Sequence, residues 1–401
     1  METIPIIDIH CHPSLKIYLC NKNIVHKHYP IPDILPSGMH VDLPGMEQGG
    51  VQIIFSYHYV PEAGLGLLPK SHRVFDLLSR LGLNIINKFE QNVPGNGCTQ
   101  QALLSMELLN HQIKRAETTF NVTIPHNLQE FESALTTGKK IIIHCLEGGH
   151  HLGKDLPDEA GYTDNLQKLR DAGLCILTIA HFFKNGLCDS GGGIPPKEAG
   201  LIGYSRQFVD PPGLTNAGRS VVQWCQNNGV IIDLTHSTTD TRNHVYQMLD
   251  ERKTAGEKVR PVIFSHTGIR EIAAPKMISE DDKLLLPDVT EIKKISDVGG
   301  VFGIILMNYW TTGIEEDDPF KKDRGIPFVL DTIDFIFKET GNFDNIAIGT
   351  DLDGFTQVPD DVTHIRLIGR LRDAILSKFG AAAAIKICKE NALRVIRKGW
   401  S

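Results

Sequence analysis

The sequence predicts an α/β protein built as a (β/α)8 TIM barrel, with a single domain over residues 1–401. Three observations support this fold class. Short strand-like runs recur along the whole chain, amphipathic helical stretches lie between them, and several runs end in histidine or a carboxylate. A three-layer doubly wound sheet is the alternative, but no glycine fingerprint follows the first run.

Eight runs carry the pattern expected of strands. Most are nearly continuous in Val, Ile and Leu, which is typical of parallel strands that are buried on both faces. The predicted strands cover residues 5–10, 50–58, 140–146, 174–181, 230–236, 261–266, 300–308 and 345–353.

The stretches between these runs include amphipathic helices with recognisable ends. The clearest is 215–229, which starts at Thr215 as a candidate N-cap and ends at Gly229 as a candidate C-cap. Other predicted helices cover residues 163–173, 326–341 and 363–380. Strands that alternate with helices in this way favour a barrel.

Three stretches lack either pattern and predict long loops at one rim of the barrel. They are residues 21–49, which are rich in proline, 186–212, which contain "SGGGIPP", and about 310–325. The charged part of the last stretch, 314–325, is expected to be a solvated loop. Long loops within a compact domain are usually functional.

Composition excludes several classes of protein. The chain has 41% hydrophobic and 22% charged residues and a net charge of −7, without a basic cluster, so we expect no nucleic-acid partner. No run approaches the roughly 20 apolar residues that cross a bilayer, and no signal peptide is visible. The eight cysteines are scattered without a C-x-x-C pair, which predicts reduced thiols and a cytoplasmic location without membrane attachment.

Polar residues collect where the predicted strands end. In a barrel these ends surround one mouth, so residues distant in sequence converge there. Each residue alone has an ordinary explanation as a rim or turn residue, but together they favour a catalytic metal site. The set comprises His10, His12, His144, Glu147, His150, His151, His181, His236, His266, Asp351 and Asp353.

The first strand, in "IIDIHCHPS", supplies two of these residues. Side chains alternate along a strand, so His10 and His12 should point the same way and could hold one divalent ion. Cys11 should point away and pack against a helix. Asp8 should lie deeper on the histidine face, where it is expected to support the metal ligands or to be a polar group of the core, and not to bind metal itself.

The remaining strand ends complete a two-metal interpretation. Glu147 could bridge two ions, and His236 and His266 suit the second ion. Metals that share a carboxylate can hold a bridging hydroxide, because metal binding lowers the pKa of water to about 7 in favourable cases. Asp351 would then move the proton, and His181 would polarise the scissile carbonyl.

The order of several motifs resembles the renal (membrane) dipeptidase family of the amidohydrolase superfamily. After the first-strand H-x-H come "LEGGH", "LTIAH", "GLTNAGRSVVQWCQNNGVIIDLTH", "PVIFSH", "IGTDLDG" and "ENALRVI". The resemblance runs from about residue 5 to residue 397. It implies a barrel with two zinc ions that hydrolyses dipeptides, often as a homodimer.

Carried over by motif, the resemblance makes Glu147 the bridging ligand and His236 and His266 ligands of one zinc ion. His181 becomes the residue that polarises the substrate, and Asp351 becomes the catalytic acid and base.

The chain departs from the family pattern in two places. The family's first strand usually reads H-x-D, whereas this chain has His10 and His12. The family also carries, beyond the "FSH" motif, an arginine that grips the substrate's terminal carboxylate. Here Lys276 and Met277 occupy roughly that place, and Lys276 lacks the bidentate fork of arginine. Arg270 lies nearer the barrel end and is the other candidate.

Further candidates for lining the pocket are His58, at the end of the second strand, and Tyr309 and Trp310, at the end of the seventh. His150 and His151 either support the site or are simple loop histidines.

The sequence therefore predicts a dinuclear zinc-dependent hydrolase, most simply a dipeptidase that attacks its substrate with a metal-bridging hydroxide. The absence of the arginine favours an alternative, the same machinery acting on an N-acyl amino acid, a lactone or a cyclic amide. A barrel that binds metal without catalysis is a third reading, against which Asp351 and His181 argue, since structural zinc needs neither.

Overall fold

The structure is a computed structural model that describes residues 3–29, 38–66, 95–196, 199–200, 203–204, 209–277, 279–314, 325–354 and 358–401. Its strands form one parallel sheet in the order β2-β1-β9-β8-β7-β6-β5-β4-β3, with a further pairing between β2 and β4. The strands are β1 (Ile6–Cys11), β2 (Val51–His58), β3 (Val122–Thr123), β4 (Lys140–Glu147), β5 (Leu174–Thr178), β6 (Ile231–Asp233), β7 (Val262–Thr267), β8 (Phe302–Ile304) and β9 (Ile346–Ile348).

The pairing of β2 with β4 closes a ring of eight strands, which confirms the predicted (β/α)8 barrel. The two strands align from Ile53 opposite Ile141 to His58 opposite Leu146. The two-residue strand β3 was not predicted. It pairs with the start of β4 and lies outside the ring, because β4 already has β2 and β5 as its barrel neighbours.

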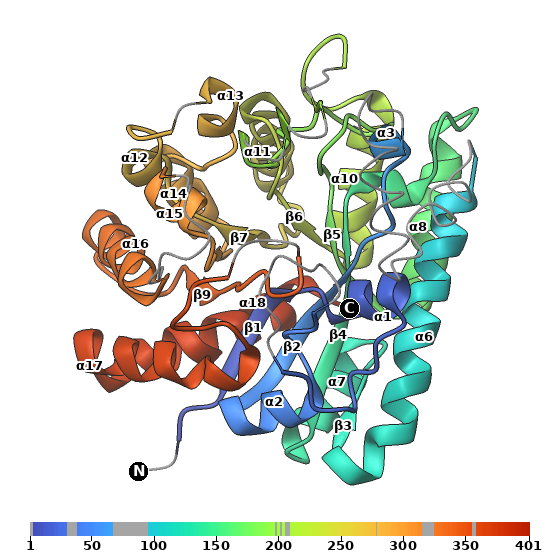
Figure 1. The fold of residues 1–401 in the computed structure, drawn as a ribbon. Coiled ribbons are helices and arrows are strands. Elements are labelled where there is room, and N and C mark those ends of the chain that lie inside the picture. Colours follow the sequence, from blue (N-terminus) through green and yellow to red (C-terminus); the bar gives the residue numbers. More distant parts are fainter. Residues whose placement is uncertain are drawn as a thin grey trace.

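Helices surround the barrel (Figure 1). They are α1 (Pro13–Cys20), α2 (Leu43–Gly49), α3 (Ala63–Gly66), α6 (Gly97–Phe120), α7 (Leu128–Thr136), η1 (Gly149–Leu152), α8 (Glu159–Asp171), α10 (Asn216–Asn228), α11 (Thr239–Thr254), α12 (Arg270–Ala273), α13 (Glu280–Lys283), α14 (Val289–Asp297), α15 (Asn308–Thr312), α16 (Gly325–Thr340), η2 (Ile365–Leu367), α17 (Gly369–Ile385), η3 (Lys386–Glu390) and α18 (Asn391–Gly399).

The ends predicted for α10 are confirmed. The Thr215 hydroxyl accepts a hydrogen bond from the Gly218 backbone N–H, and Gly229 ends the helix with a φ of 73°. Helix α8 begins at Glu159, earlier than residue 163, because the carboxylate of Asp158 caps it. The predicted helix 363–380 is a 3₁₀ turn, η2, followed by α17, which is kinked at Gly380.

Two loop predictions contain helices. Helix α2 occupies the end of the predicted loop 21–49, capped by the Asp42 carboxylate, which accepts from the Gly45 N–H. Helix α15 overlaps the start of 310–325. Most of the charged stretch 314–325 lies outside the described residues.

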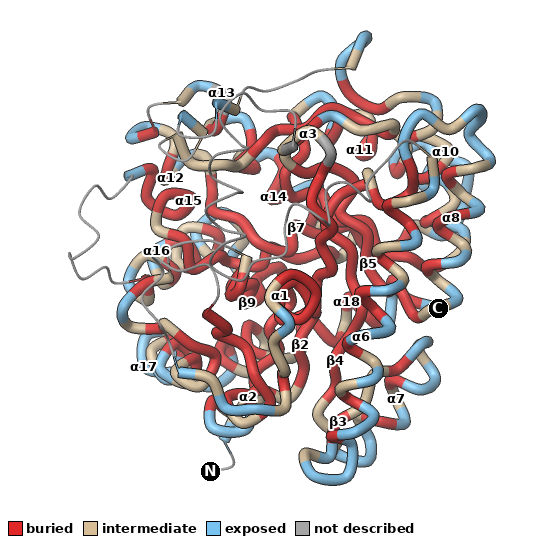
Figure 2. Tube along the Cα trace, turned by 45° about the vertical axis from the view of Figure 1, so that its right-hand side comes forward, coloured by how far each residue is buried: buried red, intermediate tan, exposed pale blue. Residues whose placement is uncertain are grey.

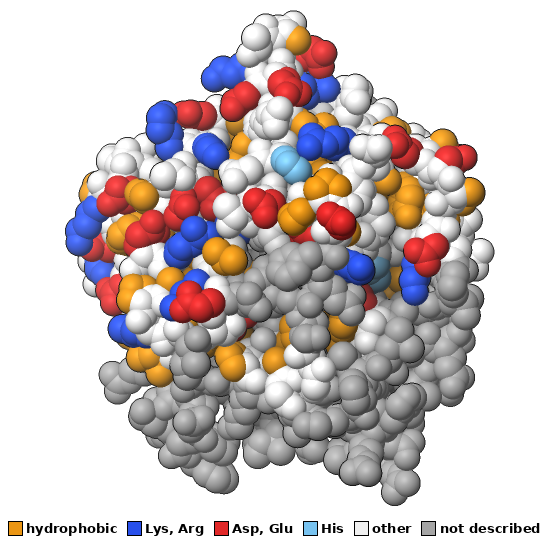
Figure 3. All heavy atoms as spheres, turned by 90° about the horizontal axis from the view of Figure 1, so that it is seen from above, with side chains coloured by type: hydrophobic (Ala, Val, Ile, Leu, Met, Phe, Trp, Pro, Cys, Tyr) orange, Lys and Arg blue, Asp and Glu red, His pale blue; other side chains and the backbone are white. Residues whose placement is uncertain are grey.

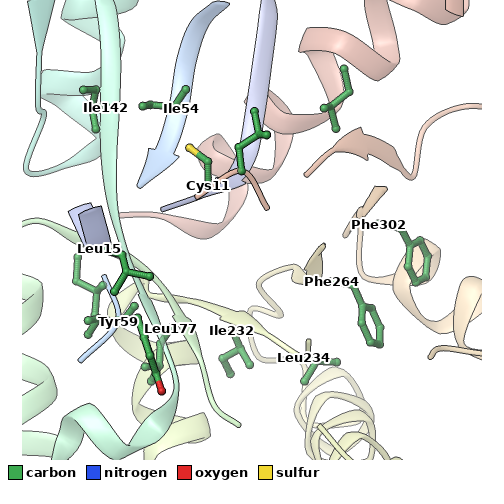
Figure 4. Close-up of a cluster of buried hydrophobic side chains, with 14 of the residues drawn as sticks. Cys11, Leu15, Ile54, Tyr59, Ile142, Leu177, Ile232, Leu234, Phe264 and Phe302 are labelled. Carbon is green, nitrogen blue, oxygen red and sulfur yellow. The ribbon is translucent and has the colours of Figure 1, made fainter. Parts of the chain in front are cut away.

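Two clusters of buried apolar side chains hold the barrel together. The larger lies between strands and helices, where Ile54 of β2 meets Ile142 of β4 and Phe264 of β7 meets Phe302 of β8 (Figure 4). The smaller takes the alternate residues of the same strands, such as Phe55, together with residues of α7 and α18. Burial of each such large side chain stabilises the fold by about 1.5–3 kcal/mol.

The outer faces of the helices carry the exposed residues, whereas the strands are buried (Figure 2). Acidic and basic side chains are interspersed on the face seen from above (Figure 3). Among the helices of the described residues, none is both long and apolar enough to cross a membrane.

Candidate metal centre and active site

The structure brings together all seven residues predicted to bind metal or act in catalysis. They come from the carboxyl ends of six strands, and each is at most 6% exposed. They are His10 and His12 at the end of β1, Glu147 at the end of β4, His181 after β5, His236 after β6, His266 in β7 and Asp351 after β9.

The Glu147 carboxylate is the centre of this group. Five imidazole Nε2 atoms lie close to it, and neither oxygen has an arginine or lysine partner among the ion pairs of the described residues. The distances are 3.2 Å from His12, 3.4 Å from His181, 3.4 Å from His236, 3.5 Å from His10 and 3.7 Å from His266.

The histidine nitrogens also crowd one another. The Nε2 atoms of His10 and His12 are 2.8 Å apart, and those of His236 and His266 are 3.2 Å apart. Two zinc-bound nitrogens in a tetrahedral site are about 3.3 Å apart, since Zn–N bonds are about 2.0–2.1 Å long. Each pair is therefore close enough to share one ion.

Backbone carbonyls set the tautomer of one histidine in each pair. Nδ1 of His12 lies 3.1 Å from the Tyr57 oxygen, and Nδ1 of His236 lies 2.7 Å from the Gly192 oxygen. A carbonyl only accepts, so Nδ1 must carry the proton in both rings. Each Nε2 then keeps a lone pair that faces the group around Glu147, as a metal ligand requires.

Ser265 supports the other histidine of each pair. Its Oγ lies 2.8 Å from Nδ1 of His10 and 3.1 Å from Nδ1 of His266, and it donates to Asp233 at 2.6 Å. Hydrogen bonds of this kind orient the imidazoles and make them stronger ligands.

The glycine run of "SGGGIPP" fits closely against His236. A Cβ on Gly193 would lie 2.7 Å from His236 Nδ1, and one on Gly191 would lie 2.8 Å from the His236 backbone oxygen. Only residues without a side chain allow this approach. This predicted rim loop thus holds a candidate ligand in place.

Asp351 lies on the β1 side of the group. Its Oδ1 is 3.4 Å from His12 Nε2 and 3.7 Å from His10 Nε2, and its N–H donates to the His10 carbonyl. The backbone is left-handed here, with a φ of 59°, and a Cβ on Gly354 would meet the Asp351 carboxylate. The tight turn of "DLDG" therefore aims this carboxylate at the site.

Burial and charge set the protonation of the group. Burial alone would raise the pKa of Glu147, but the imidazoles that surround it, with His12 and His181 foremost, hold it well below its usual range. Burial lowers the pKa of His10, and that of His266 falls well below its usual value. Neutral imidazoles at His10 and His266 and an ionised carboxylate at Glu147 are the protonation states that bind metal.

The donor atoms around Glu147 suit a metal ion. Burial alone would lower the pKa of His12 and His236, but the nearby Glu147 carboxylate raises the pKa of both. In the described part of the chain, three sets of ligand atoms lie within 4.8 Å of one another. They are His10, Glu147 and His266; His10, His12 and Asp351; and Glu147, His181 and His236. Imidazole and carboxylate donors are those that zinc takes.

Of the substrate-binding candidates, Trp310 lies against the site. Its ring stacks on His266 with centroids 5.6 Å apart and meets His236 edge-on at 5.4 Å. Tyr309 donates to Asp282 at 2.7 Å, which joins α15 to α13.

The two cationic candidates lie differently. Arg270 pairs with Asp288 at 3.1 Å and donates to the Lys283 carbonyl, so its guanidinium is held by protein groups. Lys276 is exposed.

Several strand-end residues do not join the group. The idea that His58 lines the pocket is wrong, because its ring bonds to Ser105 of α6 and to His144. His151 bonds to the backbone of Val60 and Gly148 and belongs to the loop.

Two aspartates serve the backbone near the site. Asp353 accepts from the N–H groups of His40 and Val41. Asp8 accepts from the His10 N–H and from Thr350, and so supports the histidine strand as expected.

Cys11 packs away from the site as predicted. It belongs to the cluster between strands and helices, whereas Ile7 and Ile9 belong to the other cluster. The pairing of β1 with β2 is irregular between Asp8 and Cys11, which explains this change of face. The side chains from Asp8 to His12 therefore do not alternate as regularly between the two faces of the strand as the sequence predicted.

Sequence reasoning missed Glu62. This buried carboxylate follows β2 and lies 3.0 Å from Nδ1 of His181. The sequence signal for Glu62 is "YVPEAG", which places a carboxylate just beyond the end of the strand that His58 ends.

Comparisons with known proteins identify the family of the chain. The model of the membrane dipeptidase family, peptidase family M19, matches residues 1–399. An uncharacterized dipeptidase of Schizosaccharomyces pombe is 26% identical over 220 residues, which are 55% of this chain and 43% of the relative. The match thus spans less than half the length of this curated relative.

Solved structures share the fold. The dipeptidase AC, a metallopeptidase of family M19, has a TM-score of 0.69 at 20% identity and covers 100% of this chain and 99% of its own. A metallopeptidase from Rhodobacter sphaeroides, solved with a phosphinate mimic of the dipeptide L-Ala-D-Ala, has a TM-score of 0.70 at 19% identity and covers 100% of both chains. With its family model matched over nearly the whole length and a buried histidine–carboxylate centre at the barrel mouth, the chain belongs to the membrane dipeptidase family, peptidase family M19, of metal-dependent hydrolases.

Proposed function

We propose that this chain is a dinuclear zinc-dependent dipeptidase. The observation that carries the proposal is the Glu147 carboxylate, surrounded by five imidazole Nε2 atoms at 3.2–3.7 Å. Family membership supports a peptidase. A non-catalytic metal site would have no use for Asp351 and His181 beside its ligands.

We assign the ligands by the spacing of their nitrogens. His10 and His12 would hold one ion, His236 and His266 would hold the other, and Glu147 would be a ligand of both. His12 replaces a carboxylate with a neutral imidazole, so the pair of sites has one negative charge fewer than an H-x-D strand would give. Two zinc ions would supply an activated water at neutral pH, because zinc lowers its pKa to about 7.

The chain's own residues handle the proton and the substrate carbonyl. Asp351 takes a proton from the attacking water and delivers it to the leaving amine, since its Oδ1 faces the His10 and His12 side of the group. His181 lies on the opposite side of Glu147 and stabilises the negative charge that develops on the carbonyl oxygen. Trp310 forms a wall of the substrate site beside His236 and His266.

The substrate proposal is a small dipeptide, as the R. sphaeroides relative was solved with a dipeptide mimic. An alternative is an N-acyl amino acid, a lactone or a cyclic amide. One observation favours this alternative. Arg270, a candidate for binding a terminal carboxylate, is already paired with Asp288. Lys276 and Tyr309 stay candidates for that contact. A homodimer and a cytoplasmic location also stay predictions.

A substrate panel with zinc-loaded protein tests the proposal. The panel contains L-L and L-D dipeptides, the same dipeptides amidated at the C-terminus, N-acyl amino acids and lactones, with Asp351→Asn protein as the blank. Cleavage of free but not amidated dipeptides is the expected result. Activity confined to another class moves the chain to the alternative, and protein that binds no metal contradicts the proposal.

A further inference from the structure

A second buried carboxylate lies across His181 from Glu147. Glu62 is 3% exposed and follows β2, whereas His181 follows β5. His181 Nδ1 lies 3.0 Å from Glu62 Oε2, and His181 Nε2 lies 3.4 Å from Glu147 Oε2. The imidazole therefore has one carboxylate at each ring nitrogen.

Glu62 also holds the backbone beside His181. Its Oε1 accepts a hydrogen bond from the Phe183 N–H at 3.1 Å. A Cβ on Gly64 would lie 2.6 Å from the Phe183 ring, so the chain after β2 presses closely on the chain after β5. One carboxylate thus fixes both the side chain of His181 and the course of the backbone that carries it.

The side chains that face the charge of Glu62 are histidines. Both ion pairs of Glu62 in the described part of the chain are with histidines, at 3.0 Å to His181 and 3.8 Å to His150. Burial alone would raise the pKa of Glu62, but these two rings hold it below its usual value. Glu62 is therefore a carboxylate, and a carboxylate can only accept, so Nδ1 of His181 carries a proton.

Packing restricts the remaining freedom of the ring. The centroid of His181 lies 3.7 Å from that of Phe182 and 4.7 Å from that of Tyr59. With two aromatic neighbours and a hydrogen bond at Nδ1, the ring keeps Nε2 directed at the metal group. From this position a protonated Nε2 can donate to the oxygen of the substrate carbonyl.

We propose that Glu62 is a positioning residue for catalysis, which fixes the orientation of the His181 ring and the exit of β5. The catalytic part of this proposal rests on the proposed function. The structural part does not, and it is tested separately below.

The kinetic test uses Glu62→Gln, which keeps the size of the side chain. Its amide oxygen can accept from the Phe183 N–H, but its NH₂ group then faces the protonated Nδ1 of His181, so the hydrogen bond that holds the ring is lost. We expect kcat to fall about 10- to 100-fold with KM and metal content nearly unchanged, as for other groups that orient catalytic residues. Glu62→Asp should recover part of the loss.

A double-mutant cycle separates positioning from a general defect. Once His181→Ala has removed the ring, Glu62→Gln should cost no further activity. Full additivity of the two losses, or an unchanged kcat in Glu62→Gln, overturns the proposal.

A spectroscopic readout keeps the test valid if dipeptides are not the substrate. Long-range ¹H–¹⁵N spectra of histidine-labelled protein, with the His181 signals identified by their loss in His181→Ala, report which ring nitrogen carries the proton. We expect a protonated, hydrogen-bonded Nδ1 in the parent and a changed Nδ1 signal in Glu62→Gln. An unchanged Nδ1 signal in the variant contradicts the proposal whatever the substrate panel gives.

Asp42→Asn is the matched control. Asp42 is also a buried carboxylate beside a histidine, 3.3 Å from His364 Nε2, but it caps α2. Asparagine caps helices well. This variant should leave the His181 signals and kcat unchanged, and a change in either would mean that the Glu62 effect is not specific.

Discussion

Two groups of buried histidines lie at the ends of the barrel strands, and they differ in how their ring nitrogens are paired. Strand β4 supplies His144 to one group and Glu147 to the other, three positions apart and hence on opposite faces of the strand. Glu147 meets the imidazoles at the barrel mouth. His144 meets His58 and helix α6.

The difference lies in where the protons go. In the His58–His144 pair every proton has an acceptor: His144 Nε2 donates to Asn110, His58 Nε2 donates to His144 Nδ1, and Ser105 donates to His58 Nδ1. At the mouth, Nε2 lone pairs point at one another over 2.8 Å and 3.2 Å. The first group is complete in itself, whereas the second needs a cation.

The largest effect should follow from Glu147→Gln. Loss of the central carboxylate removes the bridging oxygen and the charge that the histidines face, so we expect metal content to fall and hydrolysis to drop to background. Elemental analysis of the purified protein measures the first and a substrate assay the second. His144→Gln, altered on the other face of β4, should keep its metal. Full metal occupancy in Glu147→Gln would remove this carboxylate from the site.

Asp351→Asn should separate proton transfer from metal binding. We expect kcat to fall about 10²- to 10⁴-fold, the usual contribution of a general acid and base, with both metals retained. Metal content and kcat measured on one preparation give the comparison. A loss of metal together with activity would make Asp351 a ligand instead.

Ser265→Ala should weaken the site without removing a ligand. It deprives His10 and His266 of the oxygen at Nδ1, and changes of this kind cost about 10- to 100-fold in metal affinity. Competition with a chromophoric chelator measures the affinity. Ser105→Ala removes the equivalent hydroxyl from His58, so its affinity should stay at the parent level.

The smallest effect on activity, and the clearest on stability, should come from His144→Gln. Burial lowers the pKa of His144 from 6.5 to about 3, so the folded chain keeps this ring neutral. Below pH 6.5 the unfolded chain binds a proton that the folded chain does not. The stability due to this group is therefore full above pH 6.5 and falls towards pH 3, by about 1.4 kcal/mol per pH unit.

Urea unfolding between pH 7 and pH 5 measures this slope. Glu147→Gln protein is compared with the double variant that also carries His144→Gln, so that release of metal does not add to the pH dependence. The variant should be less stable at pH 7 but lose less on acidification. Equal slopes would mean that His144 takes up protons freely in the folded state.

The barrel and its mouth could be predicted because their signals are local. Continuous apolar runs mark the strands, and "DLTH", "FSH" and "GTDLDG" place polar residues at their ends. Helix α6 could also have been found, since Ala102, Met106, Leu109, Ile113 and Ala116 recur at helical spacing along it.

What the sequence could not supply is the face on which each strand-end residue lies. His58 and His12 both end a strand, but the irregular pairing between Asp8 and Cys11 is a property of the assembled sheet. The pairing of Arg270 with Asp288 depends in the same way on where α12 and α14 meet. The link from Glu62 to His181 joins the ends of strands that are not neighbours.

The direct pairing of β2 with β4 gives the chain a region whose length does not affect closure of the ring. The chain leaves the ring after His58 and re-enters it next door at Lys140, so closure of the ring is independent of how long the excursion between them is. We expect insertions in this excursion to leave the pairing of β2 with β4 in place. The excursion starts with the segment that carries Glu62. Changes in this segment should therefore alter the substrate side of the site and leave the metal ligands in place.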